Sequence, residues 1–115
     1  MNKVKLIECP RDAMQGIKSH FIPTEAKAQY INALLRVGFD TIDFGSFVSP
    51  KAIPQMQDTA EVLDQLDLSQ TQSKLLAIIA NTQGAEAASK HKAIQYLGFP
   101  FSISENFQMR NTHKT

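Results

Sequence analysis

Short apolar runs alternate along the chain with longer stretches in which apolar side chains recur at helical spacing. The apolar runs cover residues 4–9, 41–44, 74–80 and 93–101. The segments between them are too long for hairpins, and strands joined by helical crossovers lie parallel to one another. The pattern therefore predicts an α/β protein with four parallel strands in sequential order.

Three helices are expected between these strands, over residues 24–37, 56–66 and 84–92. Thr24 is suited to cap the first of them, and Gly38 to end it. The side chains expected on its apolar face are Ala26, Tyr30, Ala33, Leu34 and Val37. The third apolar run is almost unbroken, which is typical of a strand that is buried on both faces.

Composition narrows the class of protein. The chain has 115 residues, 43% of them hydrophobic, which suits one small domain with a core. Its net charge of +1 comes from interspersed charges, so we expect no nucleic-acid partner. The apolar runs are too short for a membrane span or a secretory leader, which predicts a cytoplasmic protein with no membrane partner. The single cysteine, Cys9, suits a reducing compartment, and its place in an apolar strand predicts a buried thiol.

Polar residues follow each of the four predicted strands. They are Arg11 and Asp12, then Asp43 and Ser46, then Asn81, and finally Ser102 and Ser104. Pro10 should end the first strand, because it has no backbone N–H to donate. Parallel strands bring their carboxyl ends to one edge, where ligands bind. An active site at this edge is therefore expected, the alternative being a solvated ion pair of Arg11 and Asp12 in a turn.

Histidines give no sign of a metal centre. The chain has His20, His91 and His113, and none of them has the spacing to another that metal ligands usually show. We expect all three on the surface.

Three segments resemble the hydroxymethylglutaryl-CoA lyase family. Residues 8–15, ECPRDAMQ, are similar to the signature of that family's first strand. Residues 45–56, GSFVSPKAIPQM, are similar to its second-strand loop almost letter for letter, and residues 107–112, FQMRNT, match the loop after its fourth strand. The second motif is the most specific, because so long an ordered match with two prolines rarely recurs by chance.

The resemblance implies a TIM barrel that cleaves an acyl-CoA to acetyl-CoA and acetoacetate in a metal-dependent retro-Claisen reaction. It implies that Asp12 is a ligand of Mg²⁺ or Mn²⁺ and that Arg11 faces the substrate carbonyl and the enolate. The further pocket residues that it implies are Gln15, Asp43, Ser46 and Asn81. Lys51 would lie near the CoA entrance, or would be an exposed loop lysine. The full-length enzyme is expected to be a homo-oligomer.

This sequence departs from the family in two residues and in length. Ala13 replaces a usual glycine and Asp43 a usual glutamate, which could mark a shifted substrate preference. A complete barrel needs eight βα units and roughly 250 residues, so residues 1–115 are expected to form a partial domain with its first four strands. The family's other metal ligands, a His-x-His pair and an asparagine, and its catalytic cysteine would lie beyond it.

We therefore expect the chain to be the N-terminal part of a lyase and to be inactive alone. A non-catalytic half-barrel that serves in assembly is one alternative. A related barrel enzyme that performs a Claisen condensation is another, which residues 46–56 disfavour.

Overall fold

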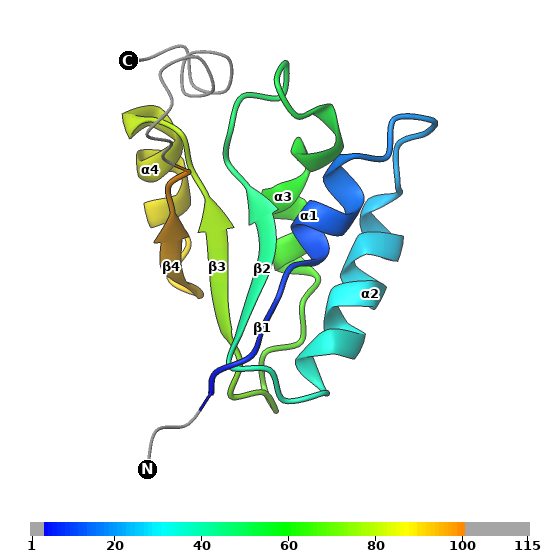
Figure 1. The fold of residues 1–115 in the computed structure, drawn as a ribbon, viewed down its shortest axis with the longest axis vertical. Coiled ribbons are helices and arrows are strands. Elements are labelled where there is room, and N and C mark those ends of the chain that lie inside the picture. The colour runs from blue at the N-terminus through cyan, green and yellow to red at the C-terminus, as the bar shows by residue number, and fades with distance from the viewer. Residues whose placement is uncertain (1–3, 101–115) are drawn as a thin grey trace.

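Four parallel strands with helices packed against them make up the part of the chain that the computed structural model describes, residues 4–100 (Figure 1). The strands are β1 (Ile7–Glu8), β2 (Thr41–Ser46), β3 (Lys74–Ile78) and β4 (Ile94–Gly98). They lie in the order β1-β2-β3-β4, and each neighbouring pair is parallel. This confirms the predicted α/β fold and its sequential strand order.

The helices between the strands are more numerous than predicted. They are α1 (Pro10–Gln15), α2 (Thr24–Leu35), α3 (Thr59–Asp64) and α4 (Thr82–Ser89), with a 3₁₀ turn, η1 (Pro54–Met56), before α3. The first three helices contact β2, and α4 contacts β4 (Figure 1). The sequence does not predict α1, and the single helix expected over residues 56–66 is split into η1 and α3. Within residues 4–100, every helix is too short or too polar to cross a membrane.

The core lies between β2, β3 and the helices packed on them. Its buried members include Ile31 of α2, Phe44 of β2 and Leu75 of β3. The apolar face predicted for α2 was wrong, because Tyr30 and Val37 are 40% and 65% exposed. The buried residues of α2 are Lys27, Ala28, Ile31 and Leu35. Apolar residues recur at helical spacing on two faces of α2. The face that packs against α3 and β2 is the one that also carries Lys27.

Thr24 does not cap α2 as predicted. The residue before the helix is Pro23, which makes no side-chain cap, and the Thr24 hydroxyl donates to Asp58 Oδ2 at 2.6 Å instead. Gly38 follows the end of α2 with a φ of 101°, a left-handed conformation that glycine adopts without steric cost. The helix itself ends at Leu35 with Arg36 as its C-cap, so Gly38 lies in the turn after α2 and not directly after the cap as predicted, while the predicted N-cap, Thr24, makes a tertiary contact instead.

The two faces of the sheet are covered unequally. Leu75 and Ala77 of β3 are buried, but Leu76 and Ile78 on its other face are only half-buried. Within residues 4–100, the prediction that β3 is buried on both faces is therefore wrong. Cys9 is exposed, and the prediction of a buried thiol was wrong. It follows the short edge strand β1, which has no partner on its outer side among the described residues.

A close approach of α3 shapes the end of β2. The register of β2 against β3 shifts between Asp43 and Gly45, as at a β-bulge. A Cβ atom on Gly45 would lie 2.5 Å from Thr59 Cγ2, so only glycine leaves room for α3 here. Bulges often re-aim side chains beside functional sites. This one follows Asp43 directly.

Candidate active site

Arg11 and Asp12 lie on a helix rather than in a turn. Pro10 stands in the first turn of α1, where its missing N–H is not needed. Ala13 lies inside the same helix, and its N–H donates to the Cys9 carbonyl at 3.2 Å. Helical residues have negative φ, so alanine in place of the family's usual glycine carries no strain. Arg11 and Gln15 are one helical turn apart and share a face.

The Arg11 guanidinium is held from two sides. Its Nε donates to Asp43 Oδ1 at 3.1 Å and to Oδ2 at 3.0 Å, and its Nη2 donates to Oδ2 at 2.8 Å. Its Nη1 donates to Gln15 Oε1 at 2.6 Å. The side chains of Arg11 and Asp43 are 15% and 7% exposed. A two-pronged pair of this kind fixes the plane of the guanidinium and ties α1 to β2.

The charge on Arg11 is secure in this setting. Burial by itself would lower the pKa of the guanidinium, but the hydrogen bonds and the negative charge of Asp43 outweigh it, and the pKa is raised above its usual value. Arg11 is therefore a permanent, oriented cation at the carboxyl end of the sheet.

Asp12 presents an open carboxylate next to this cation. Its side chain is 73% exposed, and its Oδ1 lies 3.9 Å from Arg11 Nη1. A carboxylate oxygen is a hard donor of the kind that Mg²⁺ and Mn²⁺ prefer, so Asp12 fits the role of one metal ligand. Among residues 4–100 no group of three acidic, histidine or cysteine side chains could hold a metal ion.

Ser46 and Asn81, the other two expected pocket residues, are engaged elsewhere. Ser46 is 2% exposed, and its Oγ accepts from the Val48 N–H at 3.1 Å, which shapes the loop after β2. Asn81 is exposed and caps α4, because its Oδ1 accepts from the Gly84 N–H at 2.8 Å. The structure thus brings together four of the six expected residues: Arg11, Asp12, Gln15 and Asp43.

Other expected residues lie apart from this cluster or outside the described range. Lys51 is exposed in the loop after β2. His20 is exposed, as predicted, while His91 is only half-exposed and stacks on Phe47 with ring centroids 5.6 Å apart. The remaining expected residues, Ser102, Ser104, His113 and the motif at 107–112, lie outside the described residues.

One residue with a clear structural part near the site, Gln55, is not predicted from the sequence. Gln55 belongs to the second motif and is 5% exposed, and its side-chain amide bonds the segment that follows α1. Its membership of that specific motif was the available signal.

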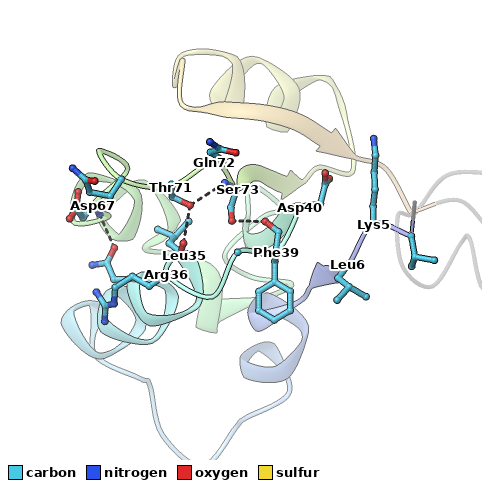
Figure 2. Close-up of a pocket in the computed structure, with 14 residues that line it drawn as sticks. Lys5, Leu6, Leu35, Arg36, Phe39, Asp40, Asp67, Thr71, Gln72 and Ser73 are labelled. Carbon is cyan, nitrogen blue, oxygen red and sulfur yellow. Dashed lines mark hydrogen bonds between the residues drawn. The ribbon is translucent and has the colours of Figure 1, made fainter. Parts of the chain in front are cut away.

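A cavity at the opposite end of the sheet does not form part of this site. It measures about 810 Å³ and is lined by Lys5, Phe39, Asp40 and Ser73 among others, near the amino ends of β2 and β3 (Figure 2). Several of its polar side chains are already bonded within the protein, for example the Ser73 hydroxyl, which donates to the Phe39 carbonyl at 2.6 Å. In parallel sheets of this kind the amino end serves stability and the carboxyl end carries the chemistry.

Comparison with known proteins gives one consistent result, although no family model matches the chain. A mitochondrial hydroxymethylglutaryl-CoA lyase of Arabidopsis thaliana is 34% identical over 113 residues, which is 97% of this chain and 24% of that protein. A 3-hydroxy-3-isohexenylglutaryl-CoA/hydroxymethylglutaryl-CoA lyase of Pseudomonas aeruginosa is 38% identical over 111 residues, 95% of this chain and 36% of that protein.

A solved structure agrees with these relatives. It is a hydroxymethylglutaryl-CoA lyase of Acinetobacter baumannii in complex with coenzyme A and 3-methylmalate, 35% identical, with a TM-score of 0.88 over 96% of this chain and 36% of that one. The chain thus spans between 24% and 36% of the length of these three proteins. Sequence and fold agree along nearly all of its length, and the chain is homologous to the hydroxymethylglutaryl-CoA lyases, matching the N-terminal part of their TIM-barrel fold.

Proposed function

We propose that this chain supplies the Arg11 cation and one metal ligand, Asp12, to an enzyme that cleaves a 3-hydroxy-3-substituted glutaryl-CoA by a retro-Claisen reaction. The observation that carries the proposal is the guanidinium of Arg11, fixed by Asp43 and Gln15 beside the open carboxylate of Asp12. The lyase names of the relatives support the substrate class.

Arg11 is suited to the charge that this reaction develops. Cleavage breaks the bond between the hydroxyl-bearing carbon and the carbon next to the thioester. The alcohol becomes a ketone as a general base accepts its hydroxyl proton, and the electron pair of the broken bond passes into an enolate, which a general acid then protonates to give acetyl-CoA. A guanidinium has five N–H donors, and Arg11 uses three of its nitrogens towards Asp43 and Gln15. Two N–H donors, one on each Nη atom, remain for a substrate oxygen. A donor that is already oriented stabilises the developing charge without a cost of reorganisation.

Asp12 is the residue of this chain that would hold the metal. A divalent cation such as Mg²⁺ or Mn²⁺, when bound, would chelate and orient the substrate's oxygen atoms. The chain's own part is to keep the Asp12 carboxylate exposed and free of other strong contacts, beside the Arg11 cation. Because Arg11 already places one positive charge here, every further cation at this site meets electrostatic repulsion.

Asp43 sets where Arg11 points. Aspartate is one methylene shorter than the glutamate usual in the family, so the guanidinium is drawn closer to β2 when the pair forms. A cation set further back leaves more room for the substituent on the substrate's third carbon. The Pseudomonas relative, whose name includes an isohexenyl substrate, makes this a reasonable direction for the shifted preference.

A chimaera tests the proposal. Residues 4–100 would replace the aligned segment of the Pseudomonas aeruginosa lyase, and acetoacetate release would be measured in a coupled assay with added Mg²⁺ or Mn²⁺. We expect turnover from the chimaera and none from residues 1–115 alone, because a single carboxylate cannot hold Mg²⁺ tightly when water supplies the other ligands. A folded, metal-binding chimaera without turnover would contradict the proposal, as would turnover by the chain alone.

Two further features stay predictions. A homo-oligomeric full-length enzyme is expected from the family resemblance. The cytoplasmic location is expected from the sequence, while the relatives include both mitochondrial and cytoplasmic lyases.

A further inference from the structure

A second ion pair lies buried beneath the candidate site, in what we call the Lys27 cluster: Lys27, Asp58, Gln55, Thr24 and Phe21. Lys27 is 2% exposed, and its Nζ lies 2.6 Å from Asp58 Oδ1 and donates to the Gln55 carbonyl. The same ammonium lies 4.0 Å from the centroid of the Phe21 ring. Its three N–H donors thus have an acidic, a carbonyl and an aromatic partner.

Gln55 connects this cluster to the segment that follows α1. Its Nε2 donates to the carbonyls of Ile17 at 2.9 Å and His20 at 3.1 Å, and its Oε1 accepts from the Ile22 N–H at 2.8 Å. All three side-chain bonds of Gln55 therefore end on residues 17–22. The Gln55 carbonyl accepts from Lys27, so Gln55 links the buried ion pair to residues 17–22.

The segment in turn decides where α1 lies. Helix α1 has six residues, fewer than two turns, and so short a helix gains little stability from its own hydrogen bonds. It carries both Arg11 and Gln15, and the Ile17 N–H donates to the Met14 carbonyl at its end at 3.0 Å. Movement of residues 17–22 would therefore move the helix that presents the guanidinium.

We propose that Lys27 is a positioning residue for Arg11, acting through Gln55 and residues 17–22. This rests on the proposed function only in giving Arg11 its importance, since Lys27 touches neither Arg11 nor Asp12. A well-packed apolar side chain would fill the same place at less desolvation cost. An ammonium at this place makes directional bonds that an apolar residue cannot make.

Nuclear magnetic resonance of the 115-residue chain tests the link directly. The Nε–H of Arg11 points at both oxygens of Asp43, so it should give a resolved signal with slow hydrogen exchange. The first variant is the double change Lys27→Met with Asp58→Asn, which removes both buried charges together. The second is Gln55→Ala, which leaves the ion pair and cuts the link to residues 17–22. The matched control is Lys18→Met, an exposed lysine of the same segment that makes no bond to another described residue.

We expect exchange of the Arg11 Nε–H to become roughly tenfold faster or more in both test variants, because local opening of α1 becomes easier. The amide signals of Ile42 and Leu75 in the sheet should keep their protection, and Lys18→Met should change neither. If the cluster only stabilised the fold as a whole, protection from exchange would fall uniformly. The Arg11 Nε–H would then change by the same factor as the amides of Ile42 and Leu75.

The outcomes of the exchange experiment distinguish the alternatives. Unchanged exchange of the Arg11 Nε–H in either test variant overturns the proposal. If the double variant does not fold, Gln55→Ala decides alone, since it strands no buried charge; loss of the sheet in that variant also counts against a positioning role. Lyase turnover of the chimaera is read separately. A shifted Arg11 signal together with unimpaired turnover in the same variants would leave the positioning link standing and remove Arg11 from the proposed chemistry.

Discussion

Two ion pairs hold elements of this protein together, Arg11–Asp43 between α1 and β2 and Lys27–Asp58 between α2 and the start of α3, and they differ in how many hydrogen-bond donors stay free. In the Lys27–Asp58 pair the cation is 2% exposed and each of its donors has a partner. In the Arg11–Asp43 pair the cation is 15% exposed and keeps two N–H donors free of described partners. The first arrangement fixes structure, while the second can also meet a ligand. The two pairs therefore differ in the number of free N–H donors on the cation as well as in its burial.

Removing the carboxylate from each pair should separate them most strongly. Asp58→Asn leaves a fully buried ammonium with a neutral partner, and we expect a loss of about 3 kcal/mol in the free energy of unfolding. Asp43→Asn leaves a guanidinium that water and Gln15 still reach, and we expect a loss of about 1 kcal/mol. Urea titration of the two variants measures both values. Equal losses would mean that the two pairs do not differ as described.

Arg11→Lys tests whether the open pair is the reactive one. Lysine keeps the charge and loses the planar fork, so turnover of the chimaera should fall roughly a hundredfold while metal affinity stays near normal. Arg36→Lys, an exposed arginine at the other end of the sheet, should have no effect on turnover. Near-normal turnover of the Arg11 variant would reduce Arg11 to a structural partner of Asp43.

Asp12→Asn tests the carboxylate beside the open pair. An amide oxygen carries no charge, so Mn²⁺ should bind the chimaera at least roughly tenfold more weakly, given that even groups outside a metal's ligand set change affinity by that factor. Titration followed by electron paramagnetic resonance measures this, and excess metal should restore part of the activity. Asp64→Asn, an exposed acid of α3, is the control. Unaltered affinity in the Asp12 variant would remove it from the ligand set.

The smallest effect concerns Cys9, which reports on Asp43. Partial burial raises the pKa of this thiol above its usual value, and the negative charge of Asp43 raises it further. Less thiolate is then present in the folded chain than in the unfolded chain at the same pH near 8 to 9, so alkylation by iodoacetamide should be slower although Cys9 is exposed. Asp43→Asn should speed this reaction, and Asp58→Asn should not. Equal rates in both variants would show that Asp43 does not influence the thiol.

Sequence patterns could predict that four strands exist because each contains a local run of apolar residues, but the bounds were less exact, since β1 covers only Ile7–Glu8 of the run at residues 4–9. The four runs, their parallel order and the glycine after α2 follow from residue type and connection length alone. The motif at residues 8–15 and the end of the second predicted strand likewise placed Arg11, Asp12, Gln15 and Asp43 near one site, since the carboxyl ends of neighbouring parallel strands must meet. Those conclusions needed no knowledge of side-chain contacts.

Contacts between distant segments decided the rest. No local signal shows that the stripe of α2 containing Lys27 is the buried one, because its burial depends on Asp58, 31 positions later in the chain. Helix α1 is too short to be stable by its own propensity and exists because β2 and η1 hold it. Local bonds matter as well: Ser46 and Asn81 stand at strand ends as predicted, yet their side chains accept from backbone N–H groups only two and three residues further along the chain. The sequence by itself determined which residues reach the carboxyl end of the sheet, whereas tertiary structure decided which of them stay free to act there, because a polar side chain takes whichever partner the fold places nearest.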